Sequence, residues 1–153
     1  MTQSTDRIER KILLQAPRAR VWRALATAAE FGSWFGVSLQ DQSFAPGQRT
    51  QGRITHPDYQ HIVFEVWIER MEPQRLLSWR WHPAPVEKGV DYSTEPTTLV
   101  TFELQDADGG TLLSVVESGF DNVPPHRRLA AFRMNSAGWD EQMKRIEKHV
   151  AAR

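Results

Sequence analysis

The stretch PPHRRLAAFRMNSAGWDEQMKRIEKHV, residues 124–150, determines how the rest of the chain must fold. Its mainly apolar positions recur at alternating intervals of three and four, so they lie on one face of an α-helix. These positions are Leu129, Phe132, Ser136, Trp139, Met143, Ile146 and Val150. Charged residues fill the opposite face, Pro124 and Pro125 suit the first turn, and Asp121 and Asn122 precede it as candidate caps. The stretch therefore predicts a helix of about seven turns whose apolar face must pack on another layer.

The middle of this apolar face consists of small residues. Ser136 stands at its centre, followed by Ala137 and Gly138, where a large side chain is expected. Because small side chains cannot fill the interface with a facing layer, we expect a space between the helix and that layer.

The composition is that of an ordinary globular protein. The 153 residues are 40% hydrophobic, which fits one domain over residues 1–153 with one core. With 19 basic and 19 acidic residues the net charge is zero, which argues against binding to nucleic acids or to an anionic membrane. The absence of cysteine excludes disulfides, thiolate metal sites and cysteine nucleophiles. Residues 1–10 are polar and no stretch has membrane-spanning length, so we expect a cytoplasmic protein without membrane insertion.

Alternation with a period of two predicts that most of the chain before the long helix is β-structure. Residues 108–110 (Asp-Gly-Gly) mark the last two strands as a hairpin. Pro17 opens a short helix, and Thr27 with Glu30 predicts a capping box at the start of a second one. The expected strands are residues 7–15, 37–44, 49–55, 62–71, 75–81, 98–105 and 111–118. This order favours the α+β class, with a curved antiparallel sheet of about six to seven strands wrapped around the long helix.

Residues 82–96, HPAPVEKGVDYSTEP, form the one long irregular segment. A connection of about fifteen residues is unusual in a compact domain. The sequence leaves two interpretations open, a mobile hairpin tip or a flap beside the entrance of a pocket.

The sequence contains no familiar catalytic or cofactor motif. It has neither a glycine-rich phosphate loop nor a G-x-S-x-G nucleophile elbow. Its five histidines form no H-x-H or H-x-x-x-H pair. We therefore expect neither a metal site nor a cofactor.

Glu117 is the candidate catalytic residue, because it continues an apolar strand. If it shares the parity of Leu113 and Val115, its carboxylate points toward the long helix. There it can act as a general acid or base, or anchor a ligand. The alternative is a strand-end residue that turns to solvent or pairs with Arg53 or Arg80.

Aromatic side chains recur on the strands and the helix that should face one another. They form either an ordinary core or the wall of a small-molecule pocket. The candidate ligand-binding residues are Phe64, Val66, Trp79, Trp81, Val100, Phe102, Glu117, Phe132, Ser136 and Trp139.

Five segments together resemble one protein family. They are APRARVWRALATAAEFGSWF (16–35), PGQRTQG (46–52), RLLSWRW (75–81), SGF (118–120) and GWDEQMKRIEKHV (138–150). In this order, and over nearly the whole chain, they resemble the activator of heat-shock-protein-90 ATPase homologue-like family. That family lies within the START-like, birch-pollen-allergen-like (SRPBCC) superfamily.

The resemblance implies a helix-grip fold, in which a seven-stranded antiparallel sheet curls around the C-terminal helix and two short helices close one end. It also implies a hydrophobic cavity between sheet and helix, which in this superfamily holds lipids, sterols, polyketides or other apolar molecules. The family shares no catalytic motif, so the resemblance assigns no catalytic residue.

Three functions follow, in order of preference. The first is a carrier or sensor of a hydrophobic small molecule, for which we expect Ser136→Trp to abolish binding. The second is an enzyme of the cyclase or hydratase type that uses Glu117. The third, ranked lowest, is an interaction module that stimulates a chaperone ATPase. The sequence leaves a homodimer open.

Overall fold

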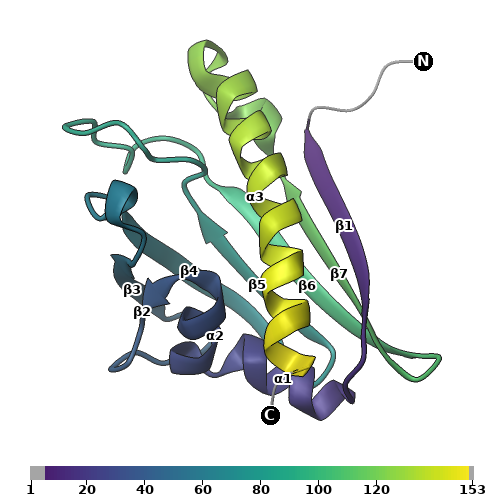
Figure 1. Ribbon diagram of the computed structural model, residues 1–153. Helices are drawn as coiled ribbons and strands as arrows, with labels where there is room; N and C mark the ends of the chain where they lie inside the picture. Colours follow the sequence, from purple (N-terminus) through teal and green to yellow (C-terminus); the bar gives the residue numbers. More distant parts are fainter. Residues whose placement is uncertain (1–5, 152–153) are drawn as a thin grey trace, which may run out of the picture.

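The computed structural model describes residues 6–151, so residues 1–5 and 152–153 at the ends of the expected domain lie outside its description. It places a seven-stranded antiparallel sheet beneath one long helix (Figure 1). The sheet order is β1-β7-β6-β5-β4-β3-β2. The strands are β1 (Arg7–Leu14), β2 (Val37–Ser38), β3 (Arg49–Ile54), β4 (Val63–Glu72), β5 (Leu76–Trp81), β6 (Thr98–Ala107) and β7 (Gly110–Ser118). The helices are α1 (Arg18–Ala26), α2 (Ala28–Phe35) and α3 (Pro125–Ala151), with 3₁₀ turns η1 (Pro57–Tyr59) and η2 (Phe120–Asn122). The predicted α+β class and helix-grip arrangement are confirmed.

Helix α3 crosses one face of the sheet, and its two ends have different neighbours (Figure 1). Helices α1 and α2 lie at its C-terminal end. The irregular connection between β5 and β6 reaches out beside its N-terminal half. This asymmetry determines where the candidate site lies.

Strand β7 shows the predicted alternation toward α3. Leu113, Val115 and Glu117 are buried while their neighbours are partly exposed, and Glu117 is 0% exposed. β7 pairs with β6 through the predicted hairpin and with β1 on its other side. The inward parity of Glu117 is therefore confirmed.

The stripe on α3 agrees with the sequence in its C-terminal half and departs from it in the N-terminal half. Trp139, Met143, Ile146 and Val150 are all buried. Leu129 is 52% exposed, so its predicted place on the packed face was wrong. In the first turns of α3 the buried residue is instead the small Ala131.

Two local predictions before β3 were also wrong. The expected strand 37–44 is reduced to Val37–Ser38, because Gln42 N–H donates to the Leu39 carbonyl in a turn that ends the sheet pairing. Thr27 precedes α2 but makes no side-chain cap hydrogen bond, so the predicted capping box is absent. Its expected partner Glu30 points elsewhere.

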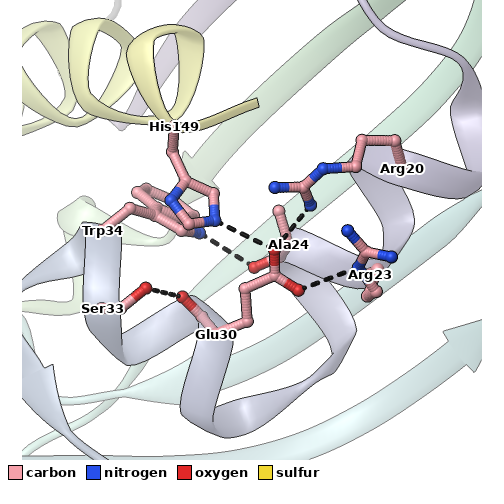
Figure 2. A network of polar contacts seen from close by, with 7 residues as sticks. All are labelled: Arg20, Arg23, Ala24, Glu30, Ser33, Trp34 and His149. Atoms are coloured by element: carbon pink, nitrogen blue, oxygen red, sulfur yellow. Dashed lines mark hydrogen bonds and ion pairs between the residues drawn. The ribbon is translucent and has the colours of Figure 1, made fainter. Parts of the chain in front are cut away.

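Glu30 joins three helices at the C-terminal end of α3 (Figure 2). Its carboxylate accepts hydrogen bonds from Arg20 at 2.5 Å and from Arg23 at 3.2 Å, and lies 3.0 Å from Nε2 of His149. Burial acts to raise the pKa of Glu30, but the hydrogen bonds from His149 and Arg20 and the charges of Arg20 and Arg23 outweigh it and lower that pKa. This cluster fixes the last turns of α3 against α1 and α2.

Candidate ligand pocket

A pocket of about 610 Å³ lies between the middle of α3 and the irregular segment after β5. One wall comes from residues 84–93 of that segment, and a second from η1 and the start of β4. Met134, Asn135, Gly138, Trp139 and Gln142 supply the α3 wall. The pocket therefore lies along the middle of α3, from Met134 to Gln142, and reaches the end of α2 at Phe35.

Four aromatic side chains meet at the inner end of this pocket. Trp81 and Trp139 lie with ring centroids 6.0 Å apart and planes tilted by 33°. Phe64 meets Trp81 edge to face at 6.1 Å, and Phe35 meets Trp139 edge to face at 6.2 Å. Phe35 and Trp81 are partly exposed, whereas Phe64 and Trp139 are 4% and 3% exposed, so this end of the pocket is apolar and aromatic.

Glu117 lies directly behind the two tryptophans. Its Oε1 accepts hydrogen bonds from the indole N–H of Trp139 at 2.8 Å and from Asn135 Nδ2 at 3.0 Å. Its Oε2 accepts from the indole N–H of Trp81 at 2.8 Å, from Thr98 Oγ1 at 2.6 Å and from the same Asn135 amide at 3.0 Å. All four donor groups are neutral, so the buried carboxylate is held by hydrogen bonds without a cationic partner among them.

This arrangement limits what Glu117 can do chemically. It is not itself part of the pocket lining, while three of its donors, Trp81, Asn135 and Trp139, are. A proton transfer between Glu117 and a bound molecule requires one of these donors to move aside. In the structure as it stands, Glu117 orients the pocket wall.

The irregular segment is tied to the first turns of α3 by Arg127. Nε of Arg127 donates to Glu95 Oε1 at 2.7 Å, and the two side chains are only 15% and 17% exposed. The Arg127 guanidinium also lies 4.7 Å from the centre of the Tyr92 ring and 3.5 Å from the Ala84 carbonyl. Because the segment lines the pocket, the interpretation as a flap is the one that agrees with its position.

The other sequence candidates lie away from the pocket lining. Val66, Trp79, Val100 and Phe102 are fully buried in the core. Phe132 packs edge to face on Phe120 at 5.3 Å. Of the ten candidates, Phe64, Trp81 and Trp139 line the pocket, and Glu117 contacts that lining.

Ser136, where the cavity-filling replacement was expected to act, does not border the pocket. Its Oγ accepts a hydrogen bond from Arg10 at 2.7 Å, and it is not among the lining residues. The residue of the small run that borders the pocket is Gly138, where an added Cβ meets no atom within 4 Å. Gly138 is therefore the position at which a large side chain enters the pocket.

The sequence reasoning missed Asn135, Gln142 and the pocket-lining part of the irregular segment. Asn135 lies four residues before Trp139, so the helical spacing that selected Ser136 is equally compatible with Asn135. A polar residue at that spacing was the available signal. No periodic pattern marks residues 84–93.

Residues 6–151 contain neither a metal-binding cluster nor a membrane-spanning helix. No group of three or more metal-binding side chains of the His, Cys, Asp or Glu type is arranged around a common point in this range. Over the same residues, no helix has both the length and the apolar composition needed to cross a bilayer.

Comparisons with known proteins agree on the fold. A family model described as Activator of Hsp90 ATPase homolog 1-like protein matches residues 15–151. No curated protein matches the chain significantly.

Solved structures give the same architecture at low identity. The structure of protein MLL2253 from Mesorhizobium loti is 24% identical, with a TM-score of 0.71 over 95% of this chain and 96% of that one. A protein from Arthrobacter aurescens is 15% identical, with a TM-score of 0.80 over 99% and 91% of the two chains. Protein Ms6760 from Mycobacterium smegmatis is 17% identical, with a TM-score of 0.75 over 97% and 93%.

Proposed function

The chain belongs to the family of Activator of Hsp90 ATPase homolog 1-like proteins, and from that premise we propose that it binds a hydrophobic small molecule in the pocket beside α3. The observation that carries this proposal is a pocket of about 610 Å³ whose inner end consists of four aromatic rings. Pockets for small ligands typically have volumes of about 300–1,000 Å³ and mostly apolar walls with a few polar groups. Asn135 and Gln142 supply polar groups on the α3 wall.

The aromatic wall is the main source of the binding free energy. Transfer of apolar surface from water contributes about 25 cal/mol for each Å² buried, and the lining offers partly exposed apolar side chains such as Phe35, Trp81 and Val86. The irregular segment, attached through Arg127 and Glu95, forms the outer wall. We place this binding function in the cytoplasm, as a carrier or sensor.

Intrinsic tryptophan fluorescence tests the proposal, because two of the six tryptophans line the pocket. The protein is titrated with fatty acids, sterols, flavonoids and aromatic polyketides. Gly138→Phe is the pocket-filling variant, since a side chain at Gly138 enters open space. Ala137→Phe is its matched control, because Ala137 is the exposed neighbour on α3 and does not line the pocket.

We expect saturable quenching by at least one ligand class in the native chain and in Ala137→Phe, with at least tenfold weaker binding in Gly138→Phe. Equal affinity in Gly138→Phe shows that this pocket is the wrong site. Absence of binding by every class contradicts the proposal and favours the interaction module, which a pull-down with the chaperone then examines.

A further inference from the structure

The two pocket tryptophans share a buried anion behind them. The indole N–H groups of Trp81 and Trp139 each donate to one oxygen of the Glu117 carboxylate at 2.8 Å, and Glu117 is 0% exposed. Resting on the proposed binding function, we infer that this pocket selects organic cations: molecules with an apolar body that carries a quaternary or protonated amine.

The first physical reason is the negative electrostatic field that the Glu117 carboxylate creates beside the pocket. Among residues 6–151, the donors to the Glu117 carboxylate are Trp81, Trp139, Asn135 and Thr98, and none of these carries a positive charge. A charge without a counter-ion in a medium of low dielectric acts on its surroundings over a longer range than a surface charge. A cation in the pocket supplies an opposite charge near this carboxylate, because Trp81, Asn135 and Trp139 both line the pocket and donate to Glu117.

The second reason is the aromatic wall itself. The faces of Trp rings attract cations through the ring quadrupole, and tryptophan is the strongest of the three aromatic side chains in this respect. Groups in a hydrogen-bonded chain polarise one another, so an indole that donates to a carboxylate has a more electron-rich ring. Both effects favour a positive charge, and disfavour a negative charge, in the pocket beside the tryptophan rings.

The charged residues that line the pocket do not reverse this preference for cations. Of the charged side chains that line the pocket, Glu65 is paired with Arg49 at 2.6 Å. The others are two carboxylates, Glu87 and Asp91, and one ammonium group, Lys88. His61 and His82 also line the pocket, and their Nε2 atoms contact the carbonyls of Val86 and Glu95, respectively. Arg127, at the far side of the flap, is paired with Glu95 and lies outside the lining.

A matched series of esters tests the inference. Benzoylcholine carries a trimethylammonium group. In 3,3-dimethylbutyl benzoate a carbon replaces that nitrogen and gives a neutral molecule of the same shape, and 3-(benzoyloxy)propane-1-sulfonate is an anion of similar length. Their affinities are measured from the ¹⁵N-resolved indole N–H signals of Trp81 and Trp139, assigned with Trp81→Phe and Trp139→Phe.

We expect benzoylcholine to bind at least fivefold more tightly than its neutral isostere, with the sulfonate weakest. Glu117→Gln removes the charge and nearly keeps the shape, so the ratio of cation to neutral affinity should fall at least threefold. A role of Glu117 in wall geometry alone lowers both affinities and leaves that ratio unchanged. Glu103→Gln removes an exposed charge on β6 outside the pocket lining and should leave the ratio as it is.

Trp81→Phe provides a second route if Glu117→Gln does not fold. Phenylalanine keeps a ring at that position but attracts cations less, so the ratio should fall there too. Equal binding of the cation and the neutral ester in the native chain overturns the inference and leaves the proposed function standing. The inference is also overturned if another ligand class binds while all three esters fail. If no molecule binds in either experiment, both proposals fall.

Discussion

The two halves of α3 use one helix in two different ways. Toward the C-terminus, Met143, Ile146 and Val150 are buried and form a dry interface with the sheet and the short helices. Toward the N-terminus, Leu129 and Met134 are 52% and 44% exposed, and the pocket borders α3 from Met134 to Gln142, where the two halves meet. Continuous packing makes one half a source of stability, and its interruption makes the other half available for binding.

The two halves of α3 also differ in the polar contacts that attach them to the rest of the protein. In the C-terminal half, Gln142 Nε2 donates to the Phe35 carbonyl at 3.0 Å, and the Glu30 cluster holds the last turns (Figure 2). In the N-terminal half, Arg127 ties the helix to the flap through Glu95. We therefore expect the two halves to respond differently to the same kind of substitution.

The largest difference should come from deleting apolar side chains. Ile146 is 0% exposed, so Ile146→Ala should lower the free energy of unfolding by about 2–5 kcal/mol through lost burial and a residual cavity. Leu129→Ala, at an exposed position, should change it by less than about 0.5 kcal/mol. Urea denaturation of the two variants measures both values, and similar losses at the two positions would break the comparison.

The next effect should be confined to the flap. Arg127→Ala leaves the largely buried Glu95 carboxylate without its ion-pair partner, which costs on the order of 1–3 kcal/mol locally. We expect faster hydrogen exchange in residues 82–96 and unchanged exchange in residues 139–150. Arg133→Ala, at an exposed position on the same helix, is the control. Faster exchange at the C-terminal end of α3 would show that the two halves are not independent.

The division between the halves also explains how far the sequence could predict the structure. Periodicity identified the strands apart from residues 39–44, and it identified the C-terminal half of α3 and placed Glu117 inward, because in those parts burial on one face is continuous. Leu129 departed from the predicted stripe, because apolar spacing does not reveal how far along a helix the packed face continues. Asn135 and Ser136 fit the spacing from Trp139 equally well, and only the packed structure distinguishes them.

The pocket itself depends on information that local pattern does not carry. Residues 84–93 have no period, and their position follows from contacts of Arg127 with Tyr92 and Glu95. The donors to Glu117 come from β5, β6 and α3, which are far apart in the sequence. The candidate residue was recognised, but its neutral hydrogen-bond shell could be seen only in the fold.

The pH dependence of stability should report on the C-terminal end of α3. The pKa of Glu30 is lowered in the folded protein, so its carboxylate adds stability above the unfolded value near 4.5, and this is lost as pH falls through the lower folded pKa. We expect Glu30→Gln to cost about 1 kcal/mol at neutral pH, with the gap to the native chain closing below pH 4.5. Thermal unfolding between pH 3 and pH 7 measures this.

Glu147→Gln serves as the control for that series, because Glu147 is exposed on the same helix. A gap for Glu30→Gln that widens toward low pH would mean that the carboxylate does not stabilise the fold through the cluster of Arg20, Arg23 and His149.

The smallest change in stability should come from Gly138→Ala. Whether this change is stabilising or destabilising shows whether the space beside Gly138 is open or packed. In the interior of a helix, replacing glycine by alanine gains about 0.5–1 kcal/mol when the methyl group has room, and a Cβ at Gly138 meets no atom within 4 Å. At Gly32 in α2, the same Cβ would lie 2.2 Å from the Val37 carbonyl oxygen, so Gly32→Ala should destabilise the protein. Thermal melts of both variants make the comparison. Stabilisation by Gly138→Ala, with ligand binding retained, means that the glycine costs stability and that the space beside it is open; destabilisation would mean that this part of α3 packs as tightly as the other half.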